Sequence, residues 1–450
     1  MKFRNKKVTK WKIFPNINDK APAGYYNALG NFICLNEYED EDDFLKSKSN
    51  PTLDKKRFSI FIHEYQHYID QVSTLWGIRN IYKIFGAYHY VFMGKEEDFY
   101  NFRELTLCFK RDYFLDYYTE YYEDIFGSYE NPWKFQITSG TRFDAAGKID
   151  DTQPIPLITF FSNDGQKKVC RVPISVVSLL ETTATNKEYD FLLSEALKLE
   201  SPYKDNQLKA LSEQIEKKIY HPELALYSVA VHLTSVFLEI SNPIIAYRIS
   251  SVFAKVALNL PSELFSAIKI PKELGSTKQW VERTHYLIKN ADCGFAFYLL
   301  IKNYKDEVGK LLGSDISVDE ILSSSNLPNE KEVEQLISIE IETLSMKSLI
   351  EQQNGFDRMI ADKVFFGSKF RSIAGIGQQN ITSEEEIAQF IREKPWLVYG
   401  GKDVPQNEHL DLNEIVNKAQ FQQKLSFEEW FKLWQFCEER IDAFSEICGI

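Results

Sequence analysis

Two histidines stand four residues apart in a stretch whose apolar residues recur with the period of an α-helix. The stretch opens at Asn50, which can cap a helix, and at Pro51, which suits a first turn, and it ends at Gly77. Its predicted buried face consists of Phe58, Phe61, Ile62, Ile69, Val72 and Trp76. Residues four apart on a helix are separated by about 40° and one turn. The side chains of His63 and His67 therefore share one face and can reach the same metal ion.

Glu64 follows the first of these histidines directly, at the rim of the same face. From there its carboxylate can hydrogen-bond a water molecule on the metal and accept its proton. The run His-Glu-Tyr-Gln-His at residues 63–67 thus predicts a metal site that carries its own general base.

This run resembles the hallmark of the zincin metallopeptidases, His-Glu-x-x-His on a helix. The resemblance covers few residues. It implies one Zn²⁺ per chain, with His63 and His67 as ligands and Glu64 as the general base toward the attacking water. It also implies a metallopeptidase activity on protein or peptide substrates. The chain departs from the metzincin branch, because Asp70 and Ser73 stand where that branch has Gly and a third ligand.

A catalytic zinc needs a third protein ligand beside the two histidines. Gluzincins recruit a Glu from a separate downstream helix, and the gluzincin-like candidate here is Glu181, in a helix that Ser175 can cap. Small residues at 182–184 would let that helix pack closely against the first, and a lone acid among apolar neighbours needs a partner. Glu188, about two turns further along the same face, is the alternative ligand. The Asn-Glu-x-x-Ser-Asp pattern of thermolysin-like enzymes is absent.

Residues 128–175 have the composition of strands, since short β-branched and aromatic runs alternate with Gly, Pro, Asn and Asp. The clearest hairpin joins 157–161 to 168–172 around Asn163-Asp164-Gly165, and Pro173 ends its second strand. By the resemblance, a peptide substrate adds as a strand to a sheet edge near the active helix, and this hairpin is the local candidate. The alternative is an ordinary supporting sheet.

Most of the remaining sequence is helical in pattern. We expect a helix over 96–122, one or two apolar helices over 222–260 with a break at Asn242-Pro243, and further helices over 262–350. A last helix opens with the capping box of residues 426–429.

The predicted fold class is therefore α+β and predominantly α-helical, with a zincin-like catalytic core, a small sheet and a large helical scaffold. We expect a catalytic region over 1–200, a helical scaffold over 201–375 and a C-terminal helical region over 376–450. The last boundary is placed at the Gly- and Gln-bearing stretch 375–380, and a helix is expected to start near 382–383.

Composition excludes several classes of function. The formal net charge of -12 disfavours a nucleic-acid partner, because phosphate binding needs clustered Lys and Arg. The six cysteines form no Cys-x-x-Cys pair, which argues against a disulfide framework and a thiolate zinc site. The N-terminus lacks a signal-peptide apolar run, and the most apolar stretch, 222–238, contains Glu223 and His232. These features predict a cytoplasmic protein without a membrane partner.

Three residues are weaker candidates for supporting roles. Tyr220 or His221 could stabilise an oxyanion, and Asp70 could orient a histidine.

The primary hypothesis is an intracellular zinc metallopeptidase. The alternatives are a zinc hydrolase of a non-peptide amide, and a non-enzymatic helical protein with a structural or vestigial metal site. The helical mass beyond residue 222 could also bind a regulatory protein partner.

Overall fold

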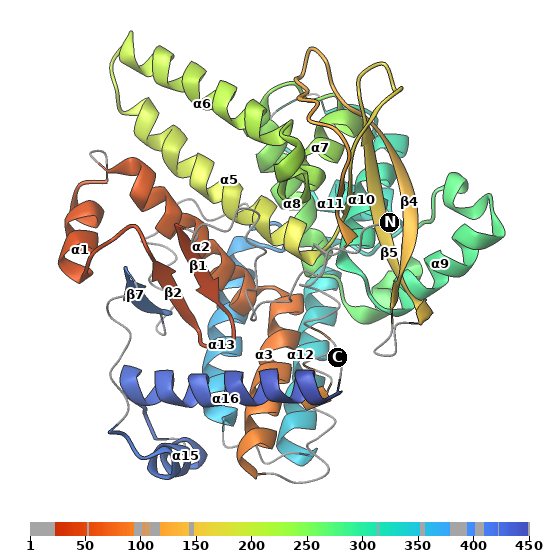
Figure 1. The fold of residues 1–450 in the computed structure, drawn as a ribbon. Coiled ribbons are helices and arrows are strands. Elements are labelled where there is room, and N and C mark those ends of the chain that lie inside the picture. The colour runs from red at the N-terminus through yellow and green to blue at the C-terminus, as the bar shows by residue number, and fades with distance from the viewer. Residues whose placement is uncertain are drawn as a thin grey trace.

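Helices make up most of the molecule, and two small sheets complete it (Figure 1), which confirms the predicted α+β, mainly helical class. The computed structural model describes residues 23–448 except 52–53, 94–101, 104, 106–107, 109–117, 144–147, 312, 314, 352–355, 379–393, 401–408 and 422.

The helix that carries the two histidines is shorter than predicted. The first three helices are α1 (Glu41–Ser49), α2 (Lys55–Ser73) and α3 (Leu75–Met93). The predicted start at Asn50 is wrong, because Asn50 caps the end of α1 and α2 begins after Asp54. The predicted end at Gly77 is wrong as well. Thr74 adopts an extended backbone and its hydroxyl accepts the Gly77 N–H at 3.0 Å, which starts a new helix.

Helix α5 (Val176–Leu197) packs between α2 and α8 (Pro243–Leu258), and it also contacts α7 (Ala225–Leu238) (Figure 1). The predicted start of α5 is confirmed, because the Ser175 hydroxyl accepts the Ser178 N–H in a capping box. The predicted break before α8 is confirmed too. The Asn242 side chain accepts the N–H groups of Ile244 and Ile245 at 3.0 and 3.2 Å.

The larger sheet is antiparallel, with strand order β3-β6-β5-β4. Its strands are β3 (Glu120–Tyr121), β4 (Lys134–Phe143), β5 (Ile149–Phe161) and β6 (Lys168–Pro173). The predicted hairpin is confirmed as β5–β6, with Gly165 at φ +82° in its turn and Pro173 as the last residue of β6. A positive φ is the conformation that glycine adopts without strain.

A second, three-stranded sheet has the order β1-β2-β7, and the sequence patterns did not predict it. Its strands are β1 (Gly24–Asn27), β2 (Phe32–Leu35) and β7 (Trp396–Tyr399). Strand β2 pairs antiparallel with β1 and parallel with β7. Both β1 and β2 contact α2, and Figure 1 shows this sheet beside α2, away from β4 and β5.

The remaining helices surround this core. They are α6 (Tyr203–Ile219), α9 (Lys278–Lys289), α10 (Cys293–Glu307), α11 (Val318–Ser324), α12 (Glu330–Glu351), α13 (Asp357–Ala374), α15 (Leu412–Gln420), α16 (Phe427–Cys448) and the short 3-10 helices η3 (Pro222–Leu224), η4 (Ser262–Ala267) and η5 (Lys272–Gly275). The capping box before α16 is confirmed, because Ser426 N donates to Glu429 at 2.8 Å and Glu429 N donates to the Ser426 hydroxyl at 3.3 Å.

Two predicted helices fall largely on residues outside the described part. Most of the helix expected over 96–122 lies there, and at its described end the prediction is wrong, because Glu120–Tyr121 pair with β6 as strand β3. The helix start expected near 382–383 also lies outside the described residues. The three-region division of the chain stays a prediction.

Among the described residues no single helix has the length and hydropathy to cross a membrane. Residues Pro222–Leu258 meet that criterion only as two helices bent by 104° at the intervening break, and both helices are largely buried.

Candidate metal centre

The two histidines of α2 and one glutamate of α5 point at one another across the contact between these helices. The imidazoles of His63 and His67 lie with ring centroids 4.9 Å apart and ring planes at 80°. Close packing is possible because α5 has the small residues Thr182 and Thr183 here, and the Thr182 hydroxyl donates to the Ser178 carbonyl of its own helix. The helix periodicity and this packing together bring Glu181 to the histidines.

The donor atoms of these three residues are spaced for a shared ion. His63 Nε2 lies 3.3 Å from Glu181 Oε2, and His67 Nε2 lies 3.7 Å from Glu181 Oε1. All three donor atoms lie within 4.8 Å of one another. Donors bound tetrahedrally at about 2.1 Å lie roughly 3.4 Å apart. The group His63, His67 and Glu181, called the metal group below, could therefore hold a metal ion.

Burial and nearby charges shift the pKa values of the two histidines of the metal group. Burial, helped by the nearby charge of His63, holds the pKa of His67 well below its ordinary value, so this imidazole is neutral. For His63 burial acts in the same direction, but hydrogen bonds to Glu181 and Glu188 outweigh it and raise the pKa well above its ordinary value. A metal ion held by His63 would therefore have to displace a proton from its ring.

Glu64 lies beside the metal group, and one of its carboxylate oxygens is buried without a hydrogen bond among the described residues. It is 7% exposed, and its Oε2 has no hydrogen-bond partner in the part of the chain that the structure describes. Burial raises the pKa of Glu64 to about 7, against the opposing effects of His63 and of the hydrogen bond from the Tyr26 backbone. A carboxylate with this pKa is suited to accept and return protons near neutral pH.

Strand β1 packs directly against Glu64. A Cβ atom on Gly24 would lie 2.8 Å from Ile60 Cγ2 and 3.3 Å from Glu64 Cγ, so the strand approaches α2 as closely as glycine allows. The strand next to the motif is thus β1. The strands β5 and β6, predicted to receive a substrate, pack against α9 and α7.

The alternative ligand, Glu188, lies on the other side of His63. Its Oε2 is 3.5 Å from His63 Nδ1, whereas Glu181 faces Nε2. Lys218 of α6 lies 4.0 Å from the second Glu188 oxygen. Among the described residues, the three-residue group that could hold an ion contains Glu181 and not Glu188. No sequence pattern predicted the contact of Lys218 with Glu188, because α6 reaches the site only through tertiary packing.

The weaker candidates occupy other positions. His221 caps η3 by accepting the Glu223 N–H at 3.2 Å, and Tyr220 is buried against the ring of Trp133. Asp70 is fully buried and ties α2 to α5. It accepts a hydrogen bond from Gln66 at 2.8 Å and another from Thr183.

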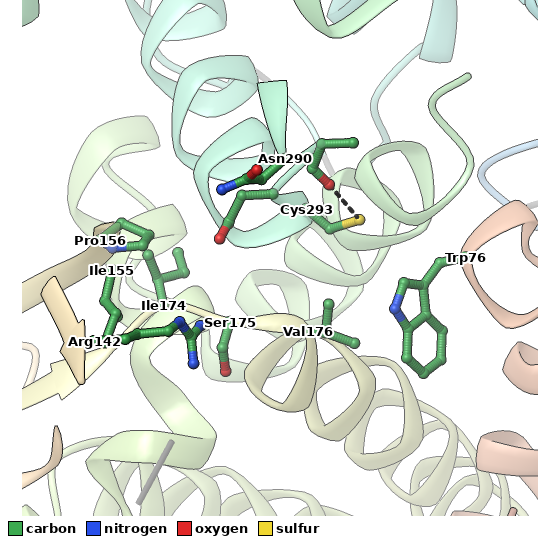
Figure 2. A pocket seen from close by; sticks show the side chains of 11 residues that line it. Trp76, Arg142, Ile155, Pro156, Ile174, Ser175, Val176, Asn290 and Cys293 are labelled. Carbon is green, nitrogen blue, oxygen red and sulfur yellow. Dashed lines mark hydrogen bonds between the residues drawn. The ribbon is translucent and has the colours of Figure 1, made fainter. Parts of the chain in front are cut away.

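A separate small cavity lies at the N-terminus of α5 (Figure 2). It encloses about 20 Å³, room for roughly one water molecule. Its walls include Trp76, Arg142, Ser175, Asn290 and Cys293, and no member of the metal group lines it. The cavity is therefore distinct from the metal group.

Comparisons of the chain with protein-family models, with curated proteins and with solved structures found no match.

Proposed function

We propose that this protein is a zinc-dependent metallopeptidase in which His63, His67 and Glu181 hold the metal and Glu64 is the general base. The observation that carries the proposal is the buried Oε2 of Glu64, which has no hydrogen-bond partner among the described residues and lies beside three convergent metal donors. A buried carboxylate oxygen without a donor costs free energy, and functional sites are where such costs are retained.

The donor set supports zinc as the ion. Two imidazole nitrogens and one carboxylate are the ligands of many catalytic zinc sites, which leave a fourth position for water or substrate. Among the described residues the group contains three such donors. When bound, zinc supplies Lewis acidity that polarises a carbonyl and makes water more acidic.

The chain's own residues supply the proton chemistry. Glu64 Oε2 accepts the proton of the attacking water and returns it to the leaving amine, for which a pKa of about 7 is suited. Neutral His67 would offer its Nε2 lone pair to a bound metal ion, and Glu181 would contribute negative charge that partly offsets the charge of the ion.

The substrate class is proposed from strand β1. It is an edge strand among the described strands and lies against Glu64 and Ile60 at Gly24. A peptide that added to this edge would run its backbone past Glu64. The burial of Glu64 and His67 favours a second candidate, the hydrolysis of a small amide that enters without a flanking chain.

The test combines metal content with hydrolysis. Elemental mass spectrometry after a mild chelator wash should find about one zinc per wild-type chain and none in His63→Ala. Glu64→Gln should keep its zinc and lose about 10²- to 10⁴-fold in the rate of hydrolysis of unstructured protein, peptide or small amide.

His221→Ala is the matched control, because this histidine caps η3 outside the metal group and the variant should keep both zinc and activity. Absence of zinc from wild type supplied with zinc would overturn the proposal, and so would full activity in Glu64→Gln. Cleavage of small amides but no peptides would leave the second candidate.

A further inference from the structure

One carboxylate outside the metal group contacts a metal-group histidine. Glu188 Oε2 lies 3.5 Å from His63 Nδ1, and Glu181 Oε2 lies 3.3 Å from Nε2 of the same ring. We propose that Glu188, held by Lys218 of α6, is the positioning residue of His63 and fixes the ring so that Nε2 faces the metal. This inference rests on the proposed metal site.

The geometry assigns different roles to the two glutamates. A metal shared with His67 must lie on the Glu181 side of His63, because His67 Nε2 lies 3.7 Å from Glu181 Oε1. Glu188 is then left with the opposite ring nitrogen, where its carboxylate accepts a hydrogen bond from the Nδ1–H. A carboxylate in this position orients an imidazole and makes the ligating nitrogen more basic.

Lys218 is the contact that holds Glu188 from the other side. Its Nζ lies 4.0 Å from Glu188 Oε1 and 5.3 Å from the ring centre of Tyr189, the next residue of α5. The side chain of Glu188 is 19% exposed and that of Lys218 is 39% exposed, so the pair lies at the rim of the site. Through this pair the position of α6 influences the orientation of His63.

The proposal is tested by titrating the full-length, metal-free protein with Co²⁺ and Zn²⁺. Glu188→Ala should raise the Kd for either metal by about 10- to 100-fold, the cost typical of losing such an outer carboxylate. Glu188→Gln retains an acceptor without the charge and should fall between wild type and Glu188→Ala. The visible absorption band of bound Co²⁺ should keep its position and intensity, because the three ligands are unchanged.

Asp190→Asn is the matched control. Asp190 lies two residues further on α5 and 3.6 Å from Arg248, so this variant removes an equal charge without touching His63. Its Kd should equal that of wild type. Lys218→Met should weaken metal binding in the same direction as Glu188→Ala but less, because Glu188 still reaches His63.

Three results for Glu188→Ala would overturn the inference. A Kd for Glu188→Ala within twofold of Asp190→Asn would show that Glu188 does not position His63. Abolished binding or an altered Co²⁺ band would make Glu188 a ligand. A thermal melting temperature lowered in step with affinity would reduce its role to stability. Wild type without metal affinity would instead refute the proposed function.

Discussion

Two clusters of buried polar side chains lie between α2 and α5, and they differ in how their hydrogen bonds are satisfied. In the Asp70 cluster (Gln66, Asp70 and Thr183), both carboxylate oxygens accept a hydrogen bond from a neighbouring side chain. In the metal group, ligand atoms of two imidazoles and one carboxylate lie within 4.8 Å of one another, and the neighbouring Glu64 Oε2 has no hydrogen-bond partner among the described residues.

The comparison teaches how to separate structural from functional polar groups in one interface. Buried polar groups that satisfy each other hold a fold together, whereas convergent ligand atoms beside an unsatisfied carboxylate oxygen form a group that could hold a metal ion. The two clusters share two helices, and Asp70 follows His67 by only three residues. Position on the helix alone therefore does not distinguish the two clusters, whereas their hydrogen-bond partners do.

The largest expected difference between variants of the two clusters is in zinc binding. His67→Ala should lose zinc binding outright, because two donors remain of the three that a catalytic site uses. Thr183→Val, in the other cluster, should retain zinc. Isothermal titration of both metal-free variants provides the measurement, and zinc binding of wild-type strength in His67→Ala would contradict the assignment.

The second effect separates the clusters by stability. Thr183→Val removes a donor to the fully buried Asp70 and should lower the free energy of unfolding by about 1–3 kcal/mol in urea. Thr182→Val is the matched control. Its hydroxyl donates to Ser178 O of its own helix at 2.8 Å and not to Asp70, so the loss of stability should be smaller. Equal losses in the two variants would show that the Asp70 contact adds nothing.

The third effect is a pH dependence that belongs to Asp70. Burial, only partly offset by the charge of Lys255 and the hydrogen bonds, raises the pKa of Asp70 from 3.8 to about 6. The folded state then binds more protons than the unfolded state between those two values. The contribution of Asp70 to the free energy of unfolding therefore falls as pH rises from about 4 to about 6.

Urea titrations of metal-free wild type and Asp70→Asn across that pH range measure this contribution. Burial lowers the pKa of His232 to about 4, which gives the opposite slope, but His232 is present in both proteins. The difference between them isolates Asp70. Parallel stability curves for the two proteins would contradict the raised pKa.

The smallest expected effect comes from a substitution that perturbs Glu64 but contacts no proposed metal ligand. Gly24→Ala places a Cβ atom 2.8 Å from Ile60 Cγ2, 3.1 Å from the Cys34 carbonyl oxygen and 3.3 Å from Glu64 Cγ, so Ile60 must move and Glu64 must shift by a few tenths of an ångström. The kcat should fall by about tenfold, less than the roughly 100-fold that a 1 Å misplacement can cost. Zinc affinity should stay at the wild-type value, and a loss of zinc would contradict the idea that β1 positions only the base.

Local signals explain which parts of the fold were predictable. The β5–β6 hairpin, the Ser175 cap, the Asn242-Pro243 break and the capping box at Ser426 each depend on residues within a few positions of one another. The break at Thr74 was missed, because the apolar period runs on through it into α3. The β1-β2-β7 sheet was missed as well, since its strands have four residues each and β2 pairs with a strand at residues 396–399.

The sequence by itself determined that His63, Glu64 and His67 share one helical region, because the 3.6-residue period places them on adjacent positions of one face. It also placed Glu181 and Glu188 on one downstream helix, but it left open which of them faces the metal donors. Only the tertiary structure decided that Glu181 faces Nε2 of both histidines while Glu188 faces Nδ1 of His63. The physical reason is that the relative placement of α2 and α5 depends on contacts between residues far apart in the chain, among them Asp70 with Thr183.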